Sequence, residues 1–583
     1  MKNFIVKTAT FSALLMCVTA CAALAGKPAP AEGQFWAMRA LHAVPFEIQT
    51  LSSQVKDGIR NDEIYFTSER GAGGKPVRIY AYLAGPVEPK GKIPAILMIH
   101  GGGGTADKAG APWMAGVFGA YVLSIDWSGI FPGHERFSHF EAVMDPKLAN
   151  QPTYVAPDLS DAGMTHIGRA CLRGIDLLLA QKEADPRHVL VMGGSWGGFL
   201  SLLTAGLDPR ITTASGAFGG GAFEGAGSLC ARDLYKAGVS PAQRAFWLEH
   251  FDPIRVVGNI RRPVMYMTAS NDRFFALACD VKTFEALPRG SVFAIGPNSD
   301  HTLGSGIDDN WMHWFKTELG REPAWETLSD FTFDGRQASW TVQGPSPTAQ
   351  SVLVFAPGHE DWPGRCWLEF AARGDGSRFR VTLPAWAQGV EGDGYVLSTD
   401  RLGRVTCTVP VHVRGKSLAE FSSGRPEPGL IDDLADGVGR WRAALYIPGQ
   451  TVAWRKSAAG QAPALELSRQ DGKAGDLGLL TNAIALAAGK LGAQGRLSFT
   501  IEAPAGGGKL KVSLVEHANL ADEKVFSVES PLKNAAGWQK IELPLAQFVL
   551  NGQSPDWGKV NELRLDLKAP EKAKYAFTGF RIQ

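Results

Sequence analysis

The stretch HVLVMGGSWGGF, residues 188–199, decides the fold of this 583-residue chain. Residues His188–Met192 have the apolar, β-branched character of a buried strand, and Phe199–Ala205 has the composition of a helix. Between them, Gly193-Gly194-Ser195-Trp196-Gly197 matches Gly-x-Ser-x-Gly, whose small residues allow a sharp turn that exposes the serine hydroxyl. Strand, turn and helix in this order predict an α/β sheet with Ser195 as a nucleophile at a strand end.

The residues on both sides of this stretch alternate short apolar runs with helical patterns, which predicts a mostly parallel sheet with flanking helices over residues 33–321. Residues Gly163–Lys182 carry an apolar stripe at helical spacing, as expected of a helix that packs on the sheet. The predicted strands are Ile93–Ile99, Tyr121–Asp126, His188–Met192, Ile211–Gly216, Pro263–Thr268 and Val292–Ile295.

A serine hydroxyl needs a base, and an acid must orient that base, in the chain order serine, acid, histidine for this fold. Asp272 follows the predicted strand Pro263–Thr268, and His301 follows Val292–Ile295. Both therefore fall on loops at the carboxyl edge of the sheet, where Ser195 also emerges. We predict a catalytic triad of Ser195, Asp272 and His301.

Other residues compete for two of these roles. Asp280 and Asp300 are the alternative acids, and His250 and His313 are the rival histidines, although both histidines lie within helical patterns.

A run of four glycines, Gly101–Gly104, follows the strand Ile93–Ile99. Glycines at this position let backbone N–H groups approach a developing oxyanion. We predict Gly102 and Trp196, the residue after the nucleophile, as the two donors. A phosphate-binding loop is the rival interpretation, but the Gly-Lys-Ser/Thr of such a loop is missing.

From residue 325 onwards the pattern changes to alternating strands separated by turns. Residues 325–415 predict a small β-sandwich, and the Ser-, Gly- and Pro-rich segment 416–429 predicts a linker. Residues 430–583 predict a larger sandwich of jelly-roll type. The predicted fold class is therefore an α/β sheet with flanking helices followed by two all-β sandwich domains.

Charge and cysteine content exclude several classes of protein. The 59 basic and 58 acidic residues nearly cancel, so no electrostatic surface for nucleic acid is expected. The chain has no CxxC and no His/Cys cluster, so we predict no metal in the active site and no structural zinc. Cys366 and Cys407 are candidates for a disulfide in an oxidising compartment. Asp432 and Asp433 are candidate ligands of a structural calcium ion.

The first 25 residues have the pattern of a cleaved export signal, because Lys2 and Lys7 precede an apolar run too short to span a bilayer. Two processing routes remain open. Ala23-Leu24-Ala25 suits ordinary cleavage, whereas Val18-Thr19-Ala20-Cys21 resembles a bacterial lipobox with Cys21 as the lipidated residue. We therefore expect a secreted or periplasmic protein that contacts a membrane only through a lipid anchor at Cys21.

Several motifs together resemble the acetyl xylan esterase and dienelactone-hydrolase-like branch of the α/β-hydrolases over residues 60–320. They are His100–Ala106, Gly193–Phe199, Leu207–Arg210, Phe251–Pro253, Asn271-Asp272 and Asp300-His301. The resemblance implies ester hydrolysis through an acyl-enzyme without a cofactor, with Ser195, Asp272 and His301 in the triad positions. It also implies acetyl or similar small acyl esters, on carbohydrate, as substrates. Asn298-Ser299-Asp300 departs from the apolar approach to the histidine that is usual in the family.

The C-terminal residues 430–583 resemble carbohydrate-binding jelly rolls. Four tryptophans there are candidates for stacking on sugar rings, namely Trp441, Trp454, Trp538 and Trp557. Two other functions remain open at this point: a serine exopeptidase of prolyl-oligopeptidase type, and a glycan-binding surface protein with an inert hydrolase domain.

Overall fold

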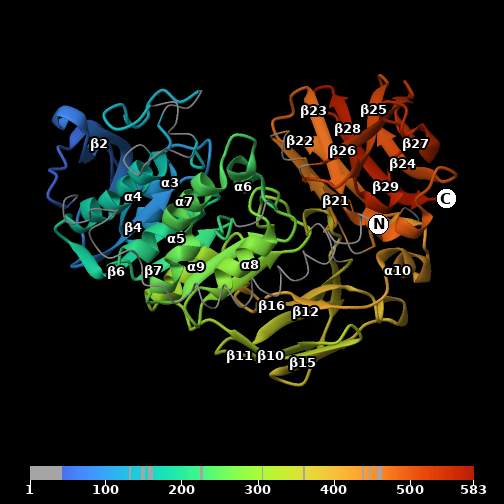
Figure 1. The fold of residues 1–583 in the computed structure, drawn as a ribbon, viewed down its shortest axis with the longest axis horizontal. Helices are drawn as coiled ribbons and strands as arrows, with labels where there is room; N and C mark the ends of the chain where they lie inside the picture. The colour runs from blue at the N-terminus through green and yellow to red at the C-terminus, as the bar shows by residue number, and fades with distance from the viewer. Residues whose placement is uncertain are drawn as a thin grey trace. The chain divides into compact units, whose positions relative to one another are not determined.

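The computed structural model describes residues 42–583 except 130–132, 146–150, 155–161, 224–226, 305, 359–361, 436, 438, 445–446, 448, 456–461 and 521. The predicted export signal, with Cys21, lies outside the described residues. The chain forms two compact units (Figure 1). The first consists of the described residues up to Met267 with Ala278–Phe293 and Asp309–Trp325, and the second of Thr268–Leu277, Ala294–Asp308 and Glu326–Gln583.

The first unit is built on a sheet with the strand order β1-β2-β3-β5-β4-β6-β7-β8-β9. Its strands are β1 (Gln49–Lys56), β2 (Ile59–Arg70), β3 (Pro76–Pro86), β4 (Ile93–Ile99), β5 (Tyr121–Ile125), β6 (Ala184–Gly194), β7 (Thr213–Ala217), β8 (Val264–Ala269) and β9 (Val292–Gly296). Strands β1 to β3 pair antiparallel, whereas β5, β4, β6, β7 and β8 pair in parallel. The carboxyl ends of these parallel strands therefore meet at one edge.

Seven α-helices are described along this part of the chain. They are α3 (Gly110–Phe118), α4 (Gly163–Leu179), α5 (Trp196–Leu207), α6 (Leu229–Arg232), α7 (Pro241–Phe251), α8 (Leu277–Glu285) and α9 (Asn310–Glu318). Helix α4 packs on β4 and β5, and α5 packs on β6 and β7 (Figure 1). The predicted mostly parallel sheet with flanking helices is confirmed.

Strand β4 and helix α4 show the burial that their sequence patterns predict. Six of the seven residues of β4 are buried, as expected of a strand covered on both faces. Helix α4 approaches this strand closely at Gly174, because a Cβ there would lie 3.0 Å from a methyl group of Leu97. The apolar stripe of α4 therefore packs directly on the centre of the sheet.

The second unit contains all the strands that follow residue 326. They are β10 (Thr327–Phe333), β11 (Gln337–Gln343), β12 (Thr348–Pro357), β13 (Leu368–Ala371), β14 (Arg373–Gly374), β15 (Arg378–Thr382), β16 (Gly392–Asp400), β17 (Val405–Cys407), β18 (Val411–Val413), β19 (Leu430–Asp432), β20 (Trp441–Ala443), β21 (Gln450–Arg455), β22 (Ala464–Arg469), β23 (Gly475–Thr481), β24 (Arg496–Ala503), β25 (Gly508–Glu516), β26 (Lys524–Leu532), β27 (Gly537–Pro544), β28 (Val560–Ala569) and β29 (Lys574–Ile582).

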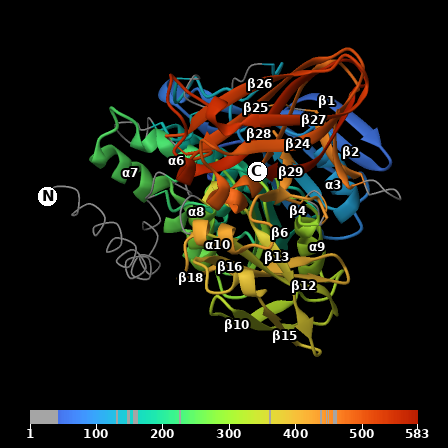
Figure 2. The same ribbon diagram turned by 90° about the vertical axis from the view of Figure 1, so that its right-hand side faces the viewer.

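These strands form antiparallel sheets in two groups. In the first group, β10-β11-β15-β14 form one sheet and β17-β16-β12-β13 run side by side, with β18 also paired to β16. In the second group, β21-β22-β29-β24-β27, with β19 on β29, form one sheet and β20-β23-β28-β25-β26 form another (Figure 2). The prediction of all-β structure after the α/β sheet is confirmed.

The two β groups share one hydrophobic core. Buried side chains from Phe333 to Ile582 form a single cluster that includes Trp340 and Phe355 from the first group and Phe499 and Phe577 from the second. Helix α10 (Leu418–Gly424) lies inside the predicted linker and begins with a capping box formed by Ser417 and Glu420. It packs against the 3-10 helix Ala483–Lys490, so this part of the predicted linker is regular, packed structure.

Among the described residues, no helix combines the length and the apolar character needed to span a membrane.

Candidate active site

Ser195 occupies the sharp turn between β6 and α5. Its backbone has φ +59° and ψ −129°, a conformation that residues other than glycine rarely adopt. Two backbone hydrogen bonds hold it: Ser195 N–H donates to Ala217 O over 2.8 Å, and Phe199 N–H donates to Ser195 O over 3.0 Å. A strained serine at the start of a helix is the geometry expected of a nucleophile in a Gly-x-Ser-x-Gly turn.

The glycines on either side of Ser195 are required by close packing. A Cβ at Gly193 would lie 2.4 Å from Ile99 O, and one at Gly197 would lie 2.1 Å from the same oxygen. Both distances are far below van der Waals contact, and the obstructing atom belongs to the backbone of β4. The turn can therefore approach β4 only if these two positions carry no side chain.

The glycine run after β4 passes directly beside the turn. Ile99 pairs with Gly193 in the parallel register of β4 and β6. A Cβ at Gly101 would lie 3.2 Å from the Cβ of Ser195, and one at Gly102 would lie 3.1 Å from Cδ1 of Trp196. The two predicted oxyanion donors, Gly102 and Trp196, thus belong to neighbouring segments.

His100 holds this glycine run in place. Its Nδ1 lies 2.7 Å from Gly101 O, and because a carbonyl can only accept, Nδ1 carries the hydrogen. Nε2 lies 3.3 Å from both the backbone nitrogen of Trp127 and Oδ1 of Asp126, and the imidazole stacks on the indole of Trp127 with ring centroids 5.1 Å apart. His100 therefore has a structural role, fixing the loop rather than transferring a proton.

Asp272 and His301 are joined by a hydrogen bond in the second unit. His301 Nδ1 lies 2.7 Å from Oδ2 of Asp272, whose side chain is fully buried. The other carboxylate oxygen, Oδ1, accepts the backbone N–H groups of Phe274 at 2.7 Å and Phe275 at 3.0 Å. Because the carboxylate accepts from Nδ1, Nε2 of His301 is left as the nitrogen that can take up a proton.

The surroundings of Asp272 have opposing effects on the pKa of its carboxyl group. Burial raises the pKa of the carboxyl group, whereas the hydrogen bonds from His301 and from the Phe275 amide oppose that rise. The rings of Phe274 and Phe275 lie 4.8 and 6.2 Å from the imidazole of His301, centroid to centroid. The pair therefore sits in an apolar setting.

The competing acids and histidines are engaged elsewhere. Asp300 forms an ion pair with Arg273, and Asp280 accepts the hydroxyl of Tyr266 at 2.5 Å and the amide of Gly220 at 3.0 Å. His313 bonds to Glu322 over 2.7 Å. His250 lies in helix α7 with its ring against Phe246. Of the predicted acids, the one whose side chain bonds to the His301 imidazole is Asp272.

Comparison with known proteins identifies relatives that match part of the chain. No family model matches the sequence. The chain is 27% identical over 255 residues to acetyl esterase Axe7A of Xylanibacter ruminicola, which covers 41% of this chain and 56% of that protein. It is 29% identical over 176 residues to feruloyl esterase B of Neurospora crassa, which covers 28% of this chain and 54% of that protein.

The chain is similar to acetyl esterases. It spans about half the length of the curated relatives it matches. Among solved structures, acetyl xylan esterase 1 from Thermoanaerobacterium sp. matches 50% of this chain and 95% of its own, at 19% identity and a TM-score of 0.43.

Two asparagines lie beside the candidate residues and had no role predicted from the sequence. Asn271 precedes Asp272, and Asn298 lies three residues before His301 with φ +54°. Both side chains are buried and hydrogen-bonded to the segment 363–367. One signal was present in the sequence at Asn298, a polar residue where apolar residues usually precede the histidine. The sequence could not show the partner of Asn298, which lies far away along the chain.

The structure separates the four tryptophans predicted to stack on sugars. Trp441 is buried and Trp557 is partly buried against the core, whereas Trp538 is 44% exposed and Trp454 is 38% exposed. Trp538 lies in the same cross-strand row as Glu502, Ala576 and Glu466. It therefore belongs to the outer face of the sheet β21-β22-β29-β24-β27.

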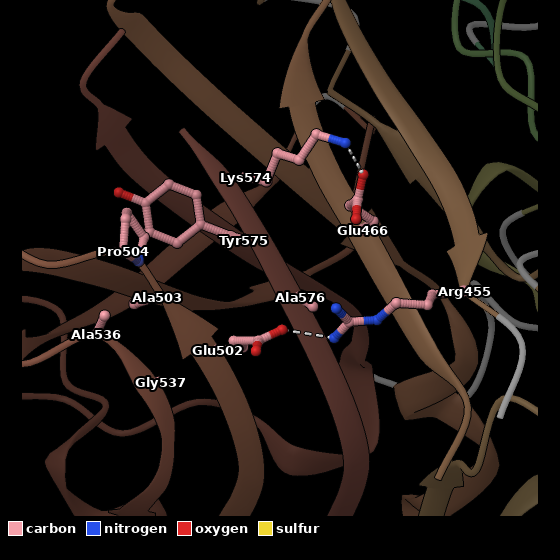
Figure 3. Close-up of a pocket in the computed structure, with 10 residues that line it drawn as sticks. All are labelled: Arg455, Glu466, Glu502, Ala503, Pro504, Ala536, Gly537, Lys574, Tyr575 and Ala576. Carbon is pink, nitrogen blue, oxygen red and sulfur yellow. Dashed lines mark hydrogen bonds and ion pairs between the residues drawn. The ribbon is translucent and has the colours of Figure 1, made fainter. Parts of the chain in front are cut away.

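A shallow groove lies on this outer face (Figure 3). Two ion pairs cross it: Arg455 bonds to Glu502 over 2.6 Å, and Lys574 bonds to Glu466 over 2.8 Å. The guanidinium of Arg455 also lies 5.4 Å from the centre of the Trp538 ring. Charged groups and an exposed aromatic ring therefore line one surface.

Asp432, a candidate calcium ligand, already accepts hydrogen bonds in the structure. Its carboxylate accepts from Arg440 and from the indole N–H of Trp441, both at 3.0 Å. Asp433 uses its carboxylate to cap the amide of Ala435. The described residues contain no group of three or more His, Cys, Asp or Glu side chains arranged to hold a metal.

Cys366 and Cys407, the predicted disulfide candidates, are separate buried thiols. Burial raises the pKa of each thiol to about 12.

Proposed function

We propose that the chain is a serine esterase that removes acetyl or similar small acyl groups from carbohydrate. The observation that carries the proposal is the strained turn at Ser195, packed so closely against β4 that Gly193 and Gly197 cannot carry a side chain. The similarity to an acetyl esterase and a feruloyl esterase supports ester chemistry. Export through the signal at residues 1–25, with or without a lipid anchor at Cys21, and catalysis without a cofactor belong to the same proposal.

The chain order supports a triad of Ser195, Asp272 and His301. Ser195 follows β6, Asp272 follows β8 and His301 follows β9, which is the order serine, acid, histidine that this fold uses. Within the second unit, the 2.7 Å hydrogen bond between His301 Nδ1 and Asp272 Oδ2 supports the acid–base pair.

In the proposed first half-reaction, Oγ of Ser195 attacks the ester carbonyl carbon while Nε2 of His301 takes the hydroxyl proton. Asp272 keeps the imidazole oriented and stabilises its positive charge. The N–H groups of Gly102 and Trp196 donate to the carbonyl oxygen as it becomes an oxyanion. The carbon–oxygen bond to the sugar then breaks, and the protonated His301 returns the proton to the leaving alcohol.

In the second half-reaction, His301 takes a proton from water, and the resulting hydroxide attacks the acyl-serine. The proton passes back to Oγ of Ser195, which releases the carboxylic acid and restores the enzyme. A protonated His301 cannot begin either step, so the rate should fall as pH is lowered through the titration of this residue.

The test is hydrolysis of a panel of acetylated oligosaccharides, p-nitrophenyl esters, feruloyl esters and dipeptidyl amides. Ser195→Ala should reduce turnover on the preferred ester by roughly 10⁴–10⁶-fold without loss of fold. Ser329→Ala, on an exposed strand of the second unit, is the control and should behave as wild type. Ser195→Ala turnover within tenfold of wild type, or preferential cleavage of the amides, would contradict the proposal.

We propose in addition that the groove beside Trp538 binds the carbohydrate chain. An exposed indole ring offers a face for a sugar ring, and the neighbouring carboxylates and guanidinium offer acceptors and donors for its hydroxyls. The bound polymer would then be held near the catalytic domain, which raises its effective concentration without changing the active site.

Affinity electrophoresis on soluble acetylated and deacetylated polysaccharides tests this second part. Trp538→Ala should lose retardation, while Trp454→Ala, whose position in its strand places it on the opposite face in the row of Leu465, should keep it. Both variants should hydrolyse p-nitrophenyl acetate at the wild-type rate. Equal retardation of wild type and Trp538→Ala would remove the groove from the proposal and leave the esterase unaffected.

A further inference from the structure

The loops that carry Asp272 and His301 are hydrogen-bonded to each other. Ser270 N–H donates to Gly296 O and Asn271 N–H donates to Ser299 O, both over 2.9 Å. Asn298 N–H donates to the hydroxyl of Ser270 over 2.8 Å. The two loops therefore form one hydrogen-bonded element, and a shift of either one displaces both members of the Asp272–His301 pair.

The side chain of Asn298 fastens this element to the first β group. Its Nδ2 donates to Trp367 O, and its Oδ1 accepts from Trp367 N–H, each over 2.8 Å. The pairing copies the two-way bond between neighbouring strands, because the side-chain amide supplies one donor and one acceptor, whereas an ionised carboxylate can only accept. Asn298 is 7% exposed, so water does not replace these bonds readily.

Asn271 makes a second attachment to the same segment. Its Nδ2 donates to Pro363 O at 2.9 Å and to Arg365 O at 2.7 Å, and its Oδ1 accepts the hydroxyl of Ser270 at 2.6 Å. The residue is fully buried. The Nδ2 end of its amide therefore joins the loop of Asp272 to residues 363–365, while its Oδ1 end is fixed by Ser270 of the same loop.

The segment 363–367 is itself held rigidly. Arg365 forms a buried ion pair with Asp393 on β16. The ring of Trp367 lies 5.2 Å from that of Tyr395, also on β16, and Trp367 runs directly into β13, which pairs with β12. The attachment point is thus part of the β-sandwich and its core.

We propose that the first β group is a working part of the catalytic centre and that Asn298 and Asn271 are positioning residues, which hold the His301 imidazole and the Asp272 carboxylate in register through residues 363–367. The inference rests on the esterase function proposed above. A displacement of about 1 Å at a catalytic group lowers the rate roughly 100-fold. Two buried attachments that prevent such a displacement would therefore have a large effect on the rate.

Two variants of Asn298 test the proposal. Asn298→Asp keeps the shape and still accepts from Trp367 N–H, but it places a carboxylate oxygen against Trp367 O. Asn298→Gly removes both bonds and keeps the left-handed backbone accessible without strain. Each should lower kcat on p-nitrophenyl acetate by about 100-fold with KM changed less than threefold, and should shift the pH–rate profile.

Gln450→Glu is the matched control. Gln450 is also a buried amide that bridges two backbone groups, since it donates to Ala444 O at 2.9 Å and accepts from Gly478 N–H at 2.8 Å. It lies in β21, and both of its backbone partners belong to the second β group. Its variant should lose thermal stability as Asn298→Asp does, yet keep the wild-type kcat and pH profile.

Deuterium uptake, followed by mass spectrometry on the full-length chain, reports on the attachment without any need for activity. Uptake in peptides covering 268–275 and 296–303 should rise in both Asn298 variants and stay at the wild-type level in Gln450→Glu. If folded Asn298 variants keep kcat within threefold and show no added uptake, the proposal is overturned. Equal losses of kcat in Gln450→Glu and Asn298→Asp would also overturn it. An inactive wild type with the expected uptake pattern would refute the esterase function and leave the attachment standing.

Discussion

Gly197→Ala is the substitution that most directly tests the packing of the nucleophile turn. The added methyl carbon would lie 2.1 Å from Ile99 O and 2.7 Å from His100 O. Carbon–oxygen contacts of this kind are normally no shorter than about 3.3 Å, so the turn and the end of β4 must separate by roughly 1 Å. The clash cannot be relieved by rotating a side chain, because both obstructing atoms are backbone carbonyl oxygens at the end of β4.

The expected cost follows from this displacement. Overpacking a close-packed interior costs typically 1–3 kcal/mol, and a clash with backbone belongs at the upper end, about 3 kcal/mol. For a unit of this size, 1 kcal/mol lowers Tm by roughly 2–4 °C, so Tm should fall by about 6–12 °C. The separation also moves Ser195 away from the Gly101–Gly104 segment, and a 1 Å error there lowers kcat by about 100-fold.

Gly194→Ala is the matched control, one residue before the nucleophile instead of two after it. A Cβ at Gly194 would have Ala217 O at 3.9 Å as its nearest neighbour, an ordinary contact. Thermal unfolding followed by circular dichroism and initial rates on p-nitrophenyl acetate should show the Gly194 variant close to wild type. A Gly197→Ala enzyme with wild-type Tm and kcat, or a Gly194→Ala enzyme equally impaired, would refute the packing argument.

Three further predictions concern other parts of the chain. Asp272→Asn should lower kcat by about 10⁴-fold, measured on the preferred ester, because the amide can present N–H to His301 and favour the wrong tautomer. Burial raises the pKa of Glu326 to about 7, so the folded state becomes progressively less stable as pH rises from 4.5 through 7. Glu326→Gln should therefore raise the free energy of unfolding at pH 8 by up to about 3 kcal/mol, measured as a higher Tm, and change it little at pH 4.5. A chain that ends at Ser417 cuts the core shared by the two β groups, so it should be insoluble or unfolded by circular dichroism; a soluble, active truncated enzyme would show that the second β group is a detachable module.

Local pattern was enough to predict much of this protein. The strand Ile93–Ile99 was predicted with the bounds that β4 has, because burial on both faces leaves an uninterrupted apolar run in the sequence. The helix expected from Gly163 begins there, because an apolar stripe at helical spacing leaves a clear period. The Ser195 turn was equally readable, since its steric demand for glycine is met within five residues.

Only the tertiary structure shows which segments of the second half of the chain pack and bond together. A Ser-, Gly- and Pro-rich segment suggested a linker, but its residues form α10 and pack on a 3-10 helix some 60 residues further along, which no local pattern reports. In the same way, Asn298 appears in the sequence as one polar residue before a histidine. Its partner is the backbone of Trp367, and hydrogen bonds to a backbone carbonyl or amide leave no trace in the partner's side chain. Sequence therefore predicted which residues carry the proposed chemistry, whereas contacts with distant backbone segments, which no local pattern reports, determined what surrounds those residues.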